Sequence, residues 1–138
     1  MLTVEPTETI VALSKLLSEN RIGVAVVSRE GKAIEGVISE RDIAYGLATH
    51  GAALLDLPVS DLMTANVITC SPSEPVARVA STMLSRNVRH LPVEDNGHLV
   101  GVVSIRDVLK ERVNELQQMT ALLRRYSKET DRQPEDRE

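Results

Sequence analysis

The chain has 138 residues, of which 42% are hydrophobic and 26% are charged, and its net charge is −4 at pH 7. This length fits one compact domain or two small halves that share a core. The negative charge argues against general binding to nucleic acid or to anionic membranes, both of which attract basic proteins. The chain has no Phe or Trp and only Tyr45 and Tyr126 as aromatic residues, so the core must be aliphatic and a platform for stacking bases is lacking.

The number of cysteines and the hydropathy of the chain indicate the cellular compartment in which the protein is expected. Cys70 is the only cysteine, which excludes an intramolecular disulfide and a cysteine metal cage, and we expect it to be a small buried hydrophobic side chain. No segment approaches about 18 consecutive apolar residues, and the N-terminus lacks a basic region followed by an apolar run. We therefore expect a protein of the reducing cytoplasm, without contact to a membrane.

The first 48 residues predict the order strand, helix, strand, strand, helix. Apolar residues at helical spacing follow a signal for a helix start at residues 6–8. Two apolar runs separated by the turn at residues 28–32 predict a hairpin. Ser39 directly precedes the second helix and is its expected N-cap. The predicted elements are strand 2–4, helix 6–20, strand 22–27, strand 34–39 and helix 40–48.

The second half predicts the same order after a connector. In residues 49–64, Gly51 ends the preceding helix, and an Ala-Leu stretch and Val59–Thr64 follow it. Together they indicate a structured connector with a short helical turn. A small three-stranded sheet is marginally stable by itself, so we expect the two halves to fold as one cooperative unit. The predicted elements of this half are the extended segment 67–70, helix 74–84, strand 88–93, turn 95–97, strand 99–104 and a helix from residue 106.

One motif occurs twice. Residues 36–43 read Gly-Val-Ile-Ser-Glu-Arg-Asp-Ile, and residues 101–108 read Gly-Val-Val-Ser-Ile-Arg-Asp-Val. The flanking sequence matches as well: Thr3, Pro6 and Glu8 correspond to residues 69, 72 and 74. Self-similarity over this length indicates a duplicated folding unit.

The repeated Ser and Asp have two interpretations. Ser39 and Asp42, like Ser104 and Asp107, lie at the N-cap and in the first turn of a predicted helix, where they can satisfy free backbone N–H groups. Alternatively, a helix N-terminus at a strand end attracts phosphate, and a carboxylate there can accept hydrogen bonds from two ribose hydroxyls. The glycines at positions 36 and 101 permit close backbone approach in this second interpretation. The adjacent Arg41 and Arg106 are expected to be surface charges.

The motif and the segment Arg89-His90-Leu91-Pro92-Val93 closely resemble the cystathionine-β-synthase (CBS) domain. Two copies in tandem resemble a CBS pair, or Bateman module, over residues 2 to about 112. The resemblance implies an α+β fold of two βαββα repeats packed through their sheets about a pseudo-twofold axis, with an extended C-terminal helix. The expected parts are repeat 1 (1–48), a connector (49–64), repeat 2 (65–112), a helical extension (113–128) and a disordered tail (129–138).

The resemblance also implies two nucleotide-binding clefts between the repeats. Asp42 and Asp107 would hold ribose hydroxyls, and Ser39 and Ser104 would contact ribose or phosphate. The Asp42 cleft would be completed by Met63, Thr64, Ile68, Val88, Arg89 and His90. The Asp107 cleft would be completed by Leu2, Ile22, Gly23 and Val24.

The two expected clefts differ. Gly23-Val24 stands where the other copy has Arg89-His90, so the Asp107 cleft takes no cation from the first repeat. The segment equivalent to residues 61–64 is also missing before the first strand, which removes one wall of that cleft. Arg89 and His90 are equally compatible with a solvated strand end, and His50 and His98 are expected to be exposed and incidental.

The helical pattern continues far beyond Asp107. An amphipathic helix that displays an apolar stripe needs a cover, and packing on the chain's own sheets or on a second subunit both remain open. The polar residues 129–138 are expected to be disordered. The stripe consists of Val108, Leu109, Val113, Leu116, Met119, Leu122, Leu123 and Tyr126.

The resemblance implies a regulatory module that binds an adenosine-containing nucleotide, of the class of AMP, ADP, ATP, NAD or S-adenosylmethionine. We expect it to act in trans on a protein partner and to form a homodimer. The alternative is a structural or dimerisation module with empty or vestigial clefts. Catalytic Ser/His/Asp and Cys/His sets, a P-loop and a metal-ligand cluster are all lacking, so we expect neither enzyme activity nor a required cofactor.

Overall fold

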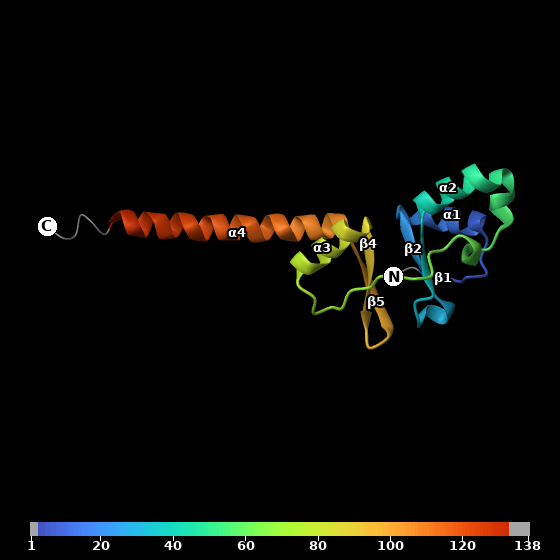
Figure 1. The fold of residues 1–138 in the computed structure, drawn as a ribbon, viewed down its shortest axis with the longest axis horizontal. Coiled ribbons are helices and arrows are strands. Elements are labelled where there is room, and N and C mark those ends of the chain that lie inside the picture. Colours follow the sequence, from blue (N-terminus) through green and yellow to red (C-terminus); the bar gives the residue numbers. More distant parts are fainter. Residues whose placement is uncertain (1–2, 133–138) are drawn as a thin grey trace. The chain divides into compact units, whose positions relative to one another are not determined.

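The computed structural model describes residues 3–132 and is of the expected α+β class (Figure 1). Its contacts divide the chain into two compact units, residues 1–73 with 90–103 and residues 74–89 with 104–138. The first unit contains both small sheets and the helices of the first repeat. The second contains the two remaining helices. None of the described helices is long and apolar enough to cross a membrane.

The first sheet has three strands, β1 (Thr3–Val4), β2 (Val24–Val27) and β3 (Gly36–Ser39), in the order β1-β2-β3. Strands β1 and β2 are parallel, and β2 and β3 form the predicted antiparallel hairpin, in which Val24 lies opposite Ser39. The 3₁₀ turn η1 (Arg29–Gly31) connects them. Strand β2 begins two residues later than predicted, because Ile22 donates its N–H to Leu17 O (3.1 Å) at the end of the preceding helix.

Helices α1 (Ile10–Asn20) and α2 (Glu40–His50) complete the first repeat. The predicted helix start at residues 6–8 is wrong, because Thr9 is the N-cap and its side chain accepts a hydrogen bond from Ala12 N (3.3 Å). Helix α1 ends at Asn20 and is capped by Arg21, whose backbone is left-handed with a φ of 52°. The aliphatic core predicted from the composition lies here and consists of Val4, Ile10, Leu13, Leu17, Ala25, Val27, Ile38, Leu54 and Val59.

The connector is structured, as predicted. It contains two 3₁₀ turns, η2 (Gly51–Asp56) and η3 (Val59–Asp61), rather than one helical turn. Ile10 N donates to Leu57 O (2.9 Å) and Val59 N donates to Glu8 O (2.7 Å), which tie the connector to the start of α1. The connector therefore has a fixed path within the first unit.

The second repeat contains α3 (Val76–Arg86), β4 (His90–Asp95), β5 (His98–Ser104) and α4 (Ile105–Arg132). Strands β4 and β5 form a two-stranded sheet. The extended segment predicted over residues 67–70 forms only a single parallel bridge, between Cys70 and Val93. Cys70 itself is buried, as expected from the sequence.

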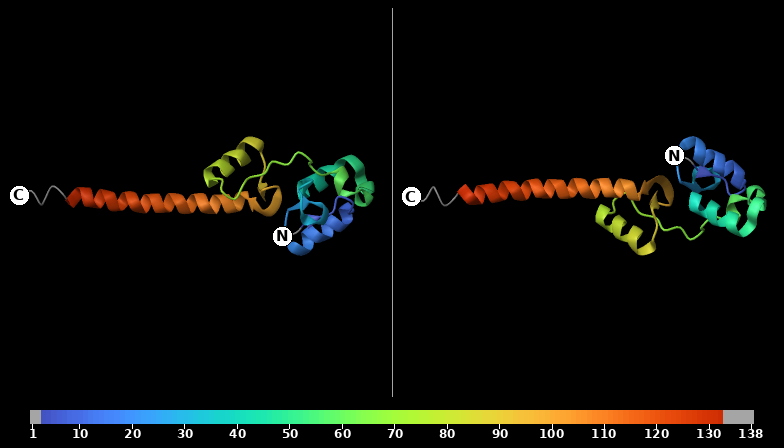
Figure 2. Two further views of the ribbon diagram at one scale, coloured as in Figure 1. Left: turned by 90° about the horizontal axis from the view of Figure 1, so that it is seen from below. Right: turned by 90° about the horizontal axis from the view of Figure 1, so that it is seen from above.

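Helix α4 is a single continuous helix that packs against α3 near its start (Figures 1 and 2). It runs to Arg132, so the backbone of residues 129–132, which were expected to belong to the tail, is helical. Residues 133–138 lie outside the described part of the chain, as do residues 1–2.

Candidate functional site

The turn from β3 into α2 is held by a reciprocal set of hydrogen bonds between two side chains. Asp42 Oδ2 accepts hydrogen bonds from Ser39 N (2.8 Å) and Ser39 Oγ (3.1 Å). In return, Ser39 Oγ accepts one from Asp42 N (3.3 Å). This is a capping box, with Asp in the place where Glu is usual. The capping interpretation of these residues is therefore confirmed for the first repeat.

The turn from β5 into α4 repeats this geometry. Asp107 Oδ2 accepts from Ser104 N (3.0 Å) and Ser104 Oγ (2.8 Å), and Ser104 Oγ accepts from Asp107 N (3.2 Å). Each carboxylate thus sits at the positive end of a helix with its Oδ2 turned to the cap. In the first repeat, Asp42 is half-buried and none of these three bonds involves its Oδ1.

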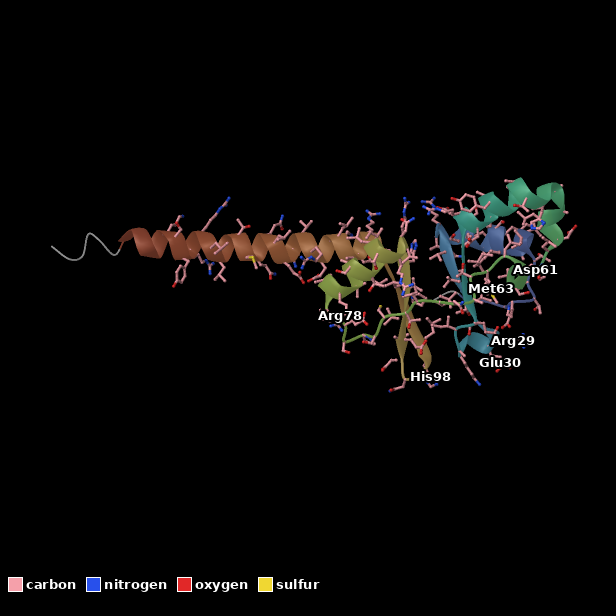
Figure 3. The ribbon with its side chains drawn as sticks, viewed as in Figure 1. Arg29, Glu30, Asp61, Met63, Arg78 and His98 are labelled. Carbon is pink, nitrogen blue, oxygen red and sulfur yellow. The ribbon has the colours of Figure 1, made fainter. Side chains whose placement is uncertain are left out.

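Met63 and Thr64 lie along β3, the strand that ends in Ser39. Val37 N donates to Thr64 O (3.0 Å) and Thr64 N donates to Val37 O (2.9 Å), which adds the connector to the edge of the sheet. Gly36 makes this approach possible, because a Cβ there would lie 2.7 Å from Met63 Sδ and 2.9 Å from Thr64 O. The structure therefore brings Met63 (labelled in Figure 3) and Thr64 to the strand that carries Ser39.

The second glycine of the duplicated motif has a different environment. A Cβ at Gly101 would meet no atom of the described residues within 4 Å. The two glycines thus differ, because the connector closely approaches Gly36 whereas no such neighbour approaches Gly101 within the described residues. The close approach of a ligand to either glycine stays a prediction.

Val88 and Arg89 precede β4. Val88 N donates to Met83 O (3.0 Å), which closes the end of α3. Arg89 is exposed, and its backbone O accepts a hydrogen bond from Ile105 N (2.7 Å) at the start of α4. Arg89 is therefore joined to the turn that carries Ser104 and Asp107 in its own repeat.

The equivalent position in the first repeat is Gly23, whose O accepts from Glu40 N (2.9 Å). A Cβ at Gly23 would lie 3.2 Å from Glu40 Oε1, so the Glu40 carboxylate lies over the glycine. The first repeat thus has a glycine covered by a carboxylate at the position where the second repeat has Arg89. Sequence reasoning did not single out Glu40. The signal was present, because Gly23 and Glu40 of the first copy stand where the second copy has Arg89 and Ile105.

Glu40 also borders a groove of about 470 Å³ in the first unit. Ile22 and Gly23, two of the predicted site residues, line it, and both are half-buried, as is Val24 beside them. Helix α1 contributes hydroxyl groups that sequence reasoning also missed. The lining residues are Ser14, Leu17, Ser18, Arg21, Ile22, Gly23, Glu40 and Ile43.

The remaining predicted residues have these positions. Ile68 is half-buried in the segment before Cys70, and His90 is half-buried as the first residue of β4. Leu2 lies outside the described residues. His50, His98, Arg41 and Arg106 are exposed, as expected. Within residues 3–132, no group of three or more His, Cys, Asp or Glu is placed to hold a metal ion.

Comparison with protein families gives two matches to the CBS domain, over residues 1–49 and 59–114. A mitochondrial CBS domain-containing protein of Arabidopsis thaliana is 30% identical over 123 residues, which cover 86% of this chain and 60% of the plant protein. Across three curated relatives, the chain spans between 57% and 64% of their lengths.

Solved structures are similar as well. A CBS-domain containing protein of Agrobacterium tumefaciens has a TM-score of 0.78 at 37% identity, with 81% of this chain and 89% of that chain covered. A CBS domain protein of Pyrobaculum aerophilum complexed with AMP has a TM-score of 0.75 at 37% identity, with 86% and 91% covered. A CBS domain pair in complex with 5'-methylthioadenosine and S-adenosyl-L-methionine has a TM-score of 0.73 at 27% identity, with 83% and 91% covered.

Proposed function

The chain belongs to the CBS-domain family, and on that premise we propose that it is a regulatory module that binds an adenosine-containing ligand at the strand–helix turns of its two repeats. The observation that carries the proposal is the pair of matching Ser–Asp turns, each with a carboxylate at a helix N-terminus. Similar proteins that bind AMP, S-adenosyl-L-methionine and 5'-methylthioadenosine support the ligand class.

In this proposal each of the two carboxylates, Asp42 and Asp107, accepts hydrogen bonds from the ribose hydroxyls of a ligand bound at its own turn. At Asp42 the capping box does not compete with this role, because Oδ2 can hold the cap while Oδ1 accepts from the ligand. Met63, Thr64 and Ile68 contact the base at the first turn, and Arg89 and His90 provide the cations for phosphate. The exposed Arg89 side chain fits that role.

A second candidate function is a structural or dimerisation module. The observation in its favour is that both capping boxes are complete without a ligand, so stability alone explains the Ser and Asp at both turns. In either function we propose that the chain is not an enzyme and that any output reaches a separate protein partner. Its cytoplasmic location remains a prediction from the sequence.

The two functions are distinguished by a thermal-shift screen with AMP, ADP, ATP, NAD and S-adenosyl-L-methionine. A ligand at 100 times its Kd should stabilise the protein by about 2.7 kcal/mol. For the ligand that gives the largest shift, we expect calorimetry to show at least tenfold weaker binding by Asp42→Ala or by Asp107→Ala. Asp56→Ala, at an exposed acid of the connector, is the matched control. No shift with any of the five ligands would favour the structural function.

A further inference from the structure

Helix α4 continues well beyond the part that packs on α3. Val108 in its second turn is 3% exposed, whereas the large apolar residues that follow are 51–72% exposed. The family match ends at residue 114, so most of these residues lie in a segment that the CBS domain itself does not account for. They are Leu109, Val113, Leu116, Met119, Leu122, Leu123 and Tyr126.

Four of these side chains, Leu109, Val113, Leu116 and Leu123, form a seam with a seven-residue period, whereas Met119, Leu122 and Tyr126 lie to one side of it. Leucine recurs at positions 109, 116 and 123, and Val113 and Thr120 each follow a leucine by four residues. Alternating spacings of four and three residues keep a row of side chains on one face of a helix that winds around another helix. This alternation is typical of a helix that packs along another helix.

The surface of α4 also has the shape that such packing requires. A shallow depression on the helix is lined by residues 113, 116, 117, 120, 121 and 124, and the first four of these have the spacing i, i+3, i+4 and i+7. Four residues at this spacing form the hole that receives one side chain from a facing helix. The holes and the leucines that can fill them thus lie on the same face of one helix.

One charged side chain beside the seam already has a partner within α4. Arg112 lies on this face between Leu109 and Leu116, and its Nη1 is 2.8 Å from Glu115 Oε2 in the next turn. The charge of Arg112 is therefore paired with a carboxylate of its own helix. Monomeric proteins rarely leave a long row of large apolar side chains in water.

We propose that residues 109–126 of α4 form a two-stranded coiled coil with α4 of a second copy of this chain. A second copy fits because the seam is self-complementary, as a twofold-symmetric interface must be. The coiled coil also explains how such a helix is stable, since helices gain most of their stability from packing of an apolar face.

The proposal is tested by light scattering and sedimentation of the full chain across a concentration series. At micromolar concentration we expect a mass twice the 15.1 kDa of one chain. The double substitution Leu116→Glu and Leu123→Glu should weaken dimerisation at least tenfold. Leu84→Glu, at a side chain of α3 that is 79% exposed, is the control and should leave the dissociation constant unchanged.

A gain-of-affinity variant guards against effects of misfolding. Thr120 lies on the seam and is exposed, so Thr120→Leu adds an apolar side chain to the interface and should tighten the dimer several-fold. Gln118→Leu, on the opposite face of α4, should not. A monomeric full chain, or a dimer equally insensitive to the glutamate and Thr120 substitutions, would overturn the proposal.

Discussion

Gly36 and Met63 are in such close contact that no side chain fits between them: a Cβ at position 36 would lie 2.7 Å from Met63 Sδ. The same Cβ would lie 2.9 Å from Thr64 O. The backbone of Thr64 is hydrogen-bonded to Val37 of β3 and therefore has little freedom to move away. The connector therefore reaches the strand that leads to Ser39 only because residue 36 is glycine. The duplicated glycine of β5 has open space instead.

The first prediction follows from this difference. Gly36→Ala should lower the free energy of unfolding by about 1–3 kcal/mol, as overpacking of a close contact does. Urea denaturation measures the change, and Gly101→Ala is the matched control, expected to be neutral. Met63→Ala should restore only part of the loss in Gly36→Ala, because the clash with Thr64 O remains. Equal effects of the two glycine substitutions would contradict the contact.

The second prediction concerns the capping boxes. Ser39→Ala and Ser104→Ala each remove the hydroxyl that accepts a hydrogen bond from the N–H of an Asp in the first turn, so each should cost about 0.5–2 kcal/mol of stability. Thermal unfolding monitored by circular dichroism is the measurement. Ser60→Ala, at an exposed serine of the connector, serves as the control. Unchanged stability in both cap variants would show that the boxes contribute nothing to folding.

The third prediction concerns the ends of α1 and α3, which are left-handed at Arg21 (φ 52°) and at Asn87 (φ 53°). Arginine is strained in this conformation, whereas glycine adopts it without a steric penalty. Arg21→Gly should therefore raise the free energy of unfolding by up to about 1 kcal/mol. Glu19→Gly, two residues earlier inside the helix, should instead lower it by a similar amount. A destabilised Arg21→Gly protein would mean that the side chain makes compensating contacts.

The fourth prediction rests on the proposed function and concerns phosphate. Replacing Arg89 and His90 with the Gly-Val of the first repeat should weaken AMP binding at least tenfold and adenosine binding much less, since only AMP uses charge-assisted hydrogen bonds from these cations. Titration calorimetry with both ligands is the measurement. Arg106→Ala, at another exposed arginine, is the control. Parallel losses for AMP and adenosine would show that Arg89 and His90 do not touch phosphate.

Features that depend on local sequence were predicted well. The duplicated motif predicted the two strand–helix turns. Ser39 is the N-cap because a short hydroxyl side chain directly before a helix can accept a hydrogen bond from a free N–H of the first helical turn. The hairpin of β2 and β3 followed from two apolar runs around a turn, and the continuation of α4 far beyond Asp107 followed from a sustained helical period, although the helix runs to residue 132 and not to the predicted residue 128. The resemblance to the CBS domain rested on the same local signals.

The sequence alone thus determined the order of the elements, the aliphatic core and the residues at each turn, because propensity, capping and hydrophobic period act over a few neighbouring residues. Only the tertiary structure decided that Thr64 adds to the edge of β3, that the Glu40 carboxylate lies over Gly23, and that Cys70 forms a single bridge with Val93. These features depend on pairing and packing between segments that are distant in the chain, and such contacts leave no periodic signal in either segment.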